Sequence, residues 1–169
     1  MVIWLIGISG AGKTTLGNKV HQYFIKNDLN SFVIDGDIVR TFYDNDLGFS
    51  IEDRVSNIKR IMLSTYVLEK NNIIPIVCNI SPFEELRDFA RIKFDSYHEI
   101  YLHKNLDIAK ENDVKGIYRD NLKKTALVGV DMKFEEPKNS NLIIKVDMES
   151  EEESLNKIIK YIKNIRHES

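Results

Sequence analysis

An eight-residue stretch near the amino terminus has the composition of a phosphate-binding loop. Residues 7–14 read Gly-Ile-Ser-Gly-Ala-Gly-Lys-Thr and match the pattern G-x-x-x-x-G-K-[ST]. Glycines let backbone N–H groups turn inward around phosphate oxygens, and the start of the following helix adds a favourable dipole. The motif therefore predicts binding of ATP and Mg²⁺ by Gly7, Ser9, Gly10, Ala11, Gly12, Lys13, Thr14 and Thr15, with Lys13 at the β- and γ-phosphates and Thr14 on the metal.

Two carboxylates follow the second apolar run of the chain. Asp35 and Asp37 flank a glycine, and Arg40 lies about one helical turn later. A carboxylate at the carboxyl end of a strand, beside a phosphate loop, can accept a hydroxyl proton or hold a magnesium-bound water. The pair favours phosphoryl transfer to a hydroxyl group, although a turn followed by a helix cap would use the same residues.

The phosphate loop alone does not separate a kinase from a GTPase switch. A guanine-reading [NT]-K-x-D string does not occur in the chain, and the D-x-x-G string at residues 113–116 lies too late for a switch. A kinase is therefore favoured. A nucleotide-binding regulator that keeps the loop without turnover is the non-enzymatic alternative, and the intact aspartate pair argues against it.

The elements that position these residues alternate between strands and helices. Unalternating apolar runs, typical of strands buried on both faces, lie at residues 2–6, 31–34, 73–77, 99–102 and 142–146. The stretches between them have helical periodicity: Leu16, Val20, Phe24 and Ile25 share one face, and Phe89 and Ile92 follow a helix start near Pro82. This alternation predicts an α/β domain with a mostly parallel sheet.

Composition limits the classes of protein that the chain can belong to. Its 169 residues are 43% hydrophobic and 30% charged, with a net charge of −2, which excludes a disordered chain and a dedicated nucleic-acid binder. We expect one domain over residues 1–169, with a mobile lid at about residues 112–141, where polar residues lack an apolar stripe. A lone cysteine, Cys78, and the lack of long apolar runs predict a cytoplasmic protein without a membrane partner.

Further motifs, taken in order, resemble those of the adenylylsulfate kinase family, which phosphorylates the ribose 3′-hydroxyl of adenosine 5′-phosphosulfate (APS). They are residues 7–15, 35–37 with Arg40, 46–50 with 53, 54 and 57, then 80–82, 113–118, 129–131 and 136–137. The resemblance implies a P-loop kinase, a three-layer sandwich around a five-stranded parallel sheet. It also implies a homodimer.

The resemblance assigns roles to individual residues. Asp37 would be the base and Asp35 would support the metal or a water, while Lys115 in the lid would approach the phosphates. The remaining substrate contacts would come from Arg40, Arg54 and Asn57 at the acceptor's 5′ end, from Phe49 stacked on its base, and from Ile80 in the pocket wall.

Among the departures from the family pattern, two bear on the acceptor. The family places a second aromatic ring where this chain has Leu127, and an apolar ring where it has Asn79. Losing a stacking ring costs on the order of 1–3 kcal/mol, and a buried amide needs a hydrogen-bond partner. A smaller base with a polar edge meets both conditions. We therefore prefer cytidine diphosphoramidate, the acceptor of related kinases in capsule phosphoramidate biosynthesis, over APS.

Overall fold

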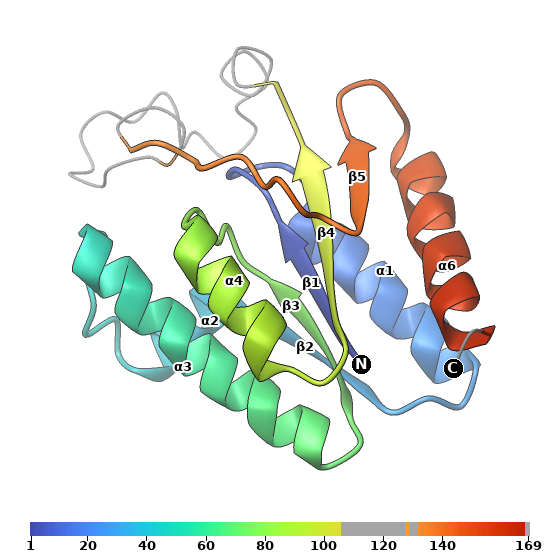
Figure 1. Cartoon of the computed structure of the whole chain (residues 1–169), viewed down its shortest axis with the longest axis horizontal. Coiled ribbons are helices and arrows are strands. Elements are labelled where there is room, and N and C mark those ends of the chain that lie inside the picture. Colours follow the sequence, from blue (N-terminus) through green and yellow to red (C-terminus); the bar gives the residue numbers. More distant parts are fainter. Residues whose placement is uncertain (106–127, 129–131, 168–169) are drawn as a thin grey trace.

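Residues 1–105, 128 and 132–167 are described in the computed structural model, and they form an open parallel sheet (Figure 1). The strands are β1 (Val2–Ile6), β2 (Ser31–Asp35), β3 (Ile74–Cys78), β4 (Tyr97–His103) and β5 (Leu142–Lys145). Their order is β2-β3-β1-β4-β5, and every pairing between neighbours is parallel. The predicted α/β class and its five-stranded parallel sheet are confirmed.

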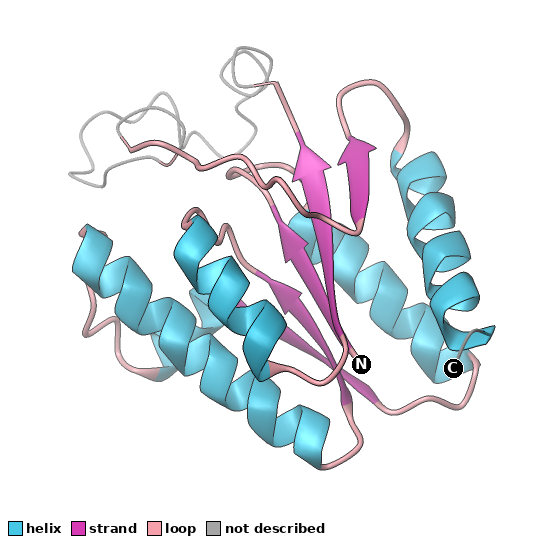
Figure 2. Ribbon diagram, viewed as in Figure 1, coloured by secondary structure: helices cyan, strands magenta, loops and turns pink. Residues whose placement is uncertain are grey.

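Helices cover both faces of this sheet and make the three layers that the resemblance implied (Figure 2). Helices α1 (Lys13–Lys26) and α6 (Glu151–His167) contact each other on one face. The other face carries α3 (Ile51–Lys70) and α4 (Glu84–Lys93), with the short α2 (Gly36–Phe42) beside α3. Because β1 lies at the centre, the loop that follows it opens between the two helical layers.

Side chains of β1 divide the core into two clusters. Ile3 and Leu5 pack under α1 and α6, whereas Val2, Trp4 and Ile6 pack under α3 and α4. All five are at most 1% exposed, which explains why this strand is an unbroken apolar run in the sequence. The last helix begins with a capping box, since Glu153 N donates to Ser150 Oγ at 3.2 Å and Ser150 N donates to Glu153 Oε2 at 2.7 Å.

Two predicted apolar faces are wrong in part. Ile25 does not share the buried face of Leu16, Val20 and Phe24, because it is 49% exposed at the end of α1. In α4 the side chains of Phe89 and Ile92 are exposed, whereas Arg87 and Ala90 face the core. The helix is turned this way because the Arg87 guanidinium has polar partners beneath it.

Only part of the expected lid can be compared with the structure. Of residues 112–141, residue 128 and residues 132–141 are described. Phe134 stacks on Tyr101 of β4 with ring centroids 5.7 Å apart, and Glu135 N donates to Pro82 O at 3.0 Å. The segment that leads back to β5 is therefore packed against the turn that follows β3.

Among the residues described, no helix combines the length and the apolar composition that crossing a bilayer requires.

The contact between α1 and β3 generates a stability prediction. A side chain at Gly17 would collide with Cys78 Sγ and would lie 3.3 Å from Leu5 Cδ1. Overpacking of this kind costs about 1–3 kcal/mol, more than the roughly 1 kcal/mol that alanine gains over glycine in a helix. Gly17→Ala should therefore lower the free energy of unfolding measured with urea. Adding Cys78→Ala should restore part of the loss, and equal stability of Gly17→Ala and wild type would contradict this packing.

Candidate active site

The phosphate loop joins β1 to α1 and depends on glycine geometry. Gly7, Gly10 and Gly12 have φ angles of 146°, 73° and 85°, which other residues rarely adopt. A side chain at Gly7 would also lie 2.5 Å from Leu102 O of β4. Lys13 Nζ donates to Gly7 O at 2.9 Å and to Ile8 O at 2.8 Å, so the ammonium lies over the loop.

A carboxylate of β2 lies next to the first turn of α1. Thr14 Oγ1 donates to Asp35 Oδ2 at 2.6 Å, and Asp35 Oδ1 accepts a hydrogen bond from Asp37 N at 2.8 Å. Asp35 is thus the N-cap of α2 as well as the neighbour of the phosphate loop. The structure brings together the two residues that were predicted to hold the metal.

These two oxygens fit a magnesium ion that is shared with a nucleotide. Mg²⁺ usually takes one or two protein ligands and completes its shell with phosphate oxygens and water. In the part of the chain that the structure describes, no group of three or more His, Cys, Asp or Glu side chains forms a cage of its own. Thr14 and Asp35 would therefore hold Mg²⁺ together with bound phosphates.

Asp37 differs from Asp35 in its surroundings. Asp35 is 9% exposed, whereas Asp37 is exposed in the first turn of α2. Its charge acts on Arg40, one turn later, where it opposes the larger effect of burial that lowers the pKa of that guanidinium. An exposed carboxylate two residues from Asp35, which contacts Thr14, is open to an incoming hydroxyl group.

Two buried arginines converge on one aromatic ring. The guanidinium carbons of Arg40 and Arg54 lie 4.7 Å and 5.3 Å from the centroid of Phe49. Arg40 Nη1 donates to Gly48 O at 2.7 Å, and Arg54 Nε donates to Phe49 O at 3.1 Å. The loop between α2 and α3 is thus held by the same two side chains that were predicted to bind the acceptor's anionic end.

The electrostatics of this arginine pair favour a negatively charged ligand. Burial lowers the pKa of both guanidinium groups, and the charge of Arg40 lowers the pKa of Arg54 further. Each shift means that the protein disfavours the positive charge at this place. An anion bound here would offset both effects, as a phosphate or sulfate group would.

Two asparagines lie around the glycine between the aspartates. Asn57 is 2% exposed, its Nδ2 donates to Gly36 O at 3.3 Å, and its Oδ1 has no partner among the described residues. Asn79 follows β3, and its Oδ1 accepts hydrogen bonds from Ser81 N and Ser81 Oγ at 2.9 Å and 3.0 Å. Between Asn79 and Ser81, Ile80 accepts a hydrogen bond through its carbonyl from Gly7 N at 3.5 Å.

Most of the predicted site residues therefore meet at one edge of the sheet, at the carboxyl ends of β1, β2 and β3, where α/β proteins bind ligands. Lys115 and Leu127 lie outside the described residues, as do residues 113–118 and 129–131.

Cys78 is buried, as expected for a small apolar residue, and burial raises the pKa of its thiol to about 12.

Two arginines to which the sequence analysis assigned no role support the site. Arg60 makes a bidentate ion pair with Asp46 at 2.7 Å, and its guanidinium lies 4.0 Å from the ring centroid of Tyr43, which fixes the loop before Phe49. Arg87 is 1% exposed and donates to Ser81 O at 2.6 Å. Its position among charged residues of α4 carries no signal of burial, so the sequence alone could not have identified it.

Comparisons with known proteins place this geometry in a family. A family model described as adenylylsulphate kinase matches residues 1–145. An adenylyl-sulfate kinase from Rippkaea orientalis is 38% identical over 162 residues, which cover 94% of this chain and 88% of the relative.

Solved structures agree with these matches. The Mycobacterium tuberculosis APS kinase CysC, in complex with AMPPNP and APS, has a TM-score of 0.88 and 28% identity, with 96% of each chain covered. A hexameric APS kinase from Thiobacillus denitrificans, at 23% identity, has the same fold with a TM-score of 0.72 over 96% of this chain and 28% of that chain. The chain belongs to the adenylylsulfate kinase family, whose members are ATP-dependent P-loop kinases that use Mg²⁺ as their usual metal.

Proposed function

We propose that this protein is an adenylylsulfate kinase, which transfers the γ-phosphate of ATP to the ribose 3′-hydroxyl of APS. The observation that carries the proposal is the contact between Thr14 and Asp35, which joins the phosphate loop to the acceptor side of the site. The buried pair Arg40 and Arg54 suits an acceptor with an anionic 5′ group. The names of the similar proteins support APS as that acceptor.

The proposed mechanism rests on positioning and charge, as phosphoryl transfer generally does. Lys13 and the loop N–H groups would hold the β- and γ-phosphates, and bound Mg²⁺ would neutralise their charge. Asp37, which is exposed toward solvent, would accept the proton of the attacking hydroxyl. Through its two hydrogen bonds, Asp35 would hold Thr14 and the first turn of α2 in fixed positions relative to each other.

Cytidine diphosphoramidate, the acceptor preferred on sequence grounds, finds no support among the similar proteins. One step of that reasoning is also weakened by geometry. The oxygen of Asn79 already has two partners on Ser81, so a polar base edge is not needed to satisfy it. The altered residues at Asn79 and Leu127 nevertheless make this nucleotide the appropriate second substrate in a test.

A side-by-side assay of the two acceptors tests the proposal. ADP release at saturating MgATP should give a kcat/KM for APS at least tenfold above that for cytidine diphosphoramidate, because APS is the acceptor named for the relatives. A higher kcat/KM for cytidine diphosphoramidate than for APS would overturn APS as the acceptor, but the protein would still be a nucleotide kinase. Absence of transfer to either nucleotide, with ATP still bound, would instead support the non-catalytic regulator.

Replacing Asp37 separates chemistry from nucleotide binding. Asp37→Ala should lower kcat at least a hundredfold, since general-base catalysis contributes typically 10²- to 10⁴-fold. Its Kd for ATP, measured by calorimetry, should stay within about threefold of the wild-type value, because the loop contacts are untouched. Glu152→Ala, which removes an exposed carboxylate on α6, is the matched control. Undiminished turnover of Asp37→Ala would remove Asp37 from the mechanism.

The homodimer implied by the family resemblance stays a prediction. The hexameric assembly belongs to the Thiobacillus denitrificans enzyme, whose likeness to this chain shows the fold.

A further inference from the structure

The turn that follows β3 is held in a strained conformation at Ser81. This residue has a φ of 49°, in the left-handed region, and it is 2% exposed. Non-glycine residues with such angles persist only where their surroundings determine them, and they cluster at functional sites. Ser81 immediately follows Asn79 and Ile80, which lie at the candidate acceptor site.

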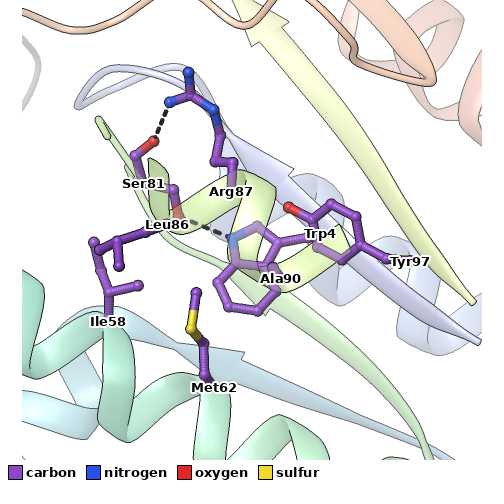
Figure 3. A pocket seen from close by; sticks show the side chains of 8 residues that line it. All are labelled: Trp4, Ile58, Met62, Ser81, Leu86, Arg87, Ala90 and Tyr97. Carbon is purple, nitrogen blue, oxygen red and sulfur yellow. Dashed lines mark hydrogen bonds between the residues drawn. The ribbon is translucent and has the colours of Figure 1, made fainter. Parts of the chain in front are cut away.

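A chain of hydrogen bonds fixes which way the Asn79 amide points. Trp4 Nε1 donates to Ser81 Oγ at 2.9 Å, and an indole N–H is a donor only (Figure 3). The Ser81 hydroxyl is then left to donate its own hydrogen to Asn79 Oδ1, 3.0 Å away. Ser81 N donates to the same oxygen at 2.9 Å. The amide oxygen of Asn79 therefore faces Ser81, and its two N–H donors face away from the turn.

Arg87 secures the other side of this turn. Its Nη1 donates to Ser81 O at 2.6 Å (Figure 3). Its Nη2 donates to Glu135 O at 2.7 Å and to Glu84. The Arg87 side chain is 1% exposed, so these bonds are shielded from water. The strained serine is thus held through its backbone N–H, its hydroxyl and its carbonyl.

The free side of the amide lies at the aspartate pair. A side chain at Gly36 would collide with Asn79 Nδ2, so the amide nitrogen lies directly against this glycine. Gly36 separates Asp35 from Asp37, and its carbonyl accepts the hydrogen bond from Asn57. Asn79 is half-buried at this place, and its Nδ2 lies at the turn between Asp35 and Asp37.

We propose that Asn79 recognises the acceptor nucleotide, donating a hydrogen bond from Nδ2 to an oxygen or a ring nitrogen of that substrate. The inference rests on the proposed function, because it assigns a further contact in the same acceptor site. The hydrogen bonds from Trp4 to Ser81 and from Ser81 to Asn79 hold the amide in the orientation that this contact needs. A flipped amide would present its oxygen and repel the same substrate atom. ATP, which binds at the phosphate loop, should not depend on this contact.

Two substitutions of Asn79 test the assignment. Asn79→Asp keeps an oxygen for both Ser81 donors but loses the outward N–H groups, and Asn79→Leu has similar size without polar atoms. Each should raise the acceptor Kd and KM about tenfold or more, as loss of a substrate hydrogen bond does, with the larger effect for the aspartate, which repels an anionic nucleotide. The Kd for ATP should change less than twofold. Asn156→Asp, the same chemical change at an exposed position of α6, is the control and should alter neither constant.

Calorimetry with APS and with cytidine diphosphoramidate distinguishes the outcomes. If wild type phosphorylates an acceptor and Asn79→Asp binds it with unchanged Kd, the amide has only a structural role. The inference about Asn79 then fails, while the proposed function stands. If wild type binds a nucleotide without phosphorylating it, the proposed function fails, and the Kd ratio of variant to wild type still decides the role of Asn79. If wild type binds neither nucleotide, both proposals fail. Should Asn79→Asp not fold, the Kd of Asn79→Leu decides in the same way.

Discussion

The hydrogen bond between Thr14 Oγ1 and Asp35 Oδ2 is the interaction on which the rest of the site depends. It connects the first turn of α1 with the end of β2, although β1 and β2 are separated by β3 in the sheet. Through its other oxygen, Asp35 caps α2 and thereby sets the position of Asp37. One carboxylate therefore aligns the ATP side and the acceptor side, which phosphoryl transfer requires to within a fraction of an ångström.

Two positively charged side chains are buried on the proposed acceptor side of the site. Arg40 and Arg54 are buried against the ring of Phe49, and their guanidinium groups also hold the backbone of the loop that carries this ring. In the proposed function, the side chains that order the loop would therefore also bind the anion. An acceptor with an anionic 5′ group would relieve the unfavourable burial of both charges.

Much of this arrangement could be predicted from the sequence because its signals are local. The central strand β1 is buried on both faces and is an unbroken apolar run, whereas Phe32 of β2 and Ile143 of β5 are exposed in the apolar runs at the sheet's edges. The phosphate loop needs glycines at fixed spacing. The orientation of α4 could not be predicted, since burial of Arg87 depends on the carbonyl of Glu135, 48 residues later in the chain, and on the unusual turn that presents the carbonyl of Ser81. The same holds for Asn79: its sequence position suggested a contact with a base, but only the bonds to Ser81 show which of its atoms is available.

The position of the transferred phosphate tests the central claim most directly. After reaction with MgATP and APS, phosphorus and proton NMR of the purified product locate the new phosphomonoester on the nucleotide. The proposed function, with Asp37 as the base, predicts a single product, phosphorylated at the ribose 3′-oxygen. A product phosphorylated elsewhere, or hydrolysis of ATP without any transfer to APS, would contradict the account.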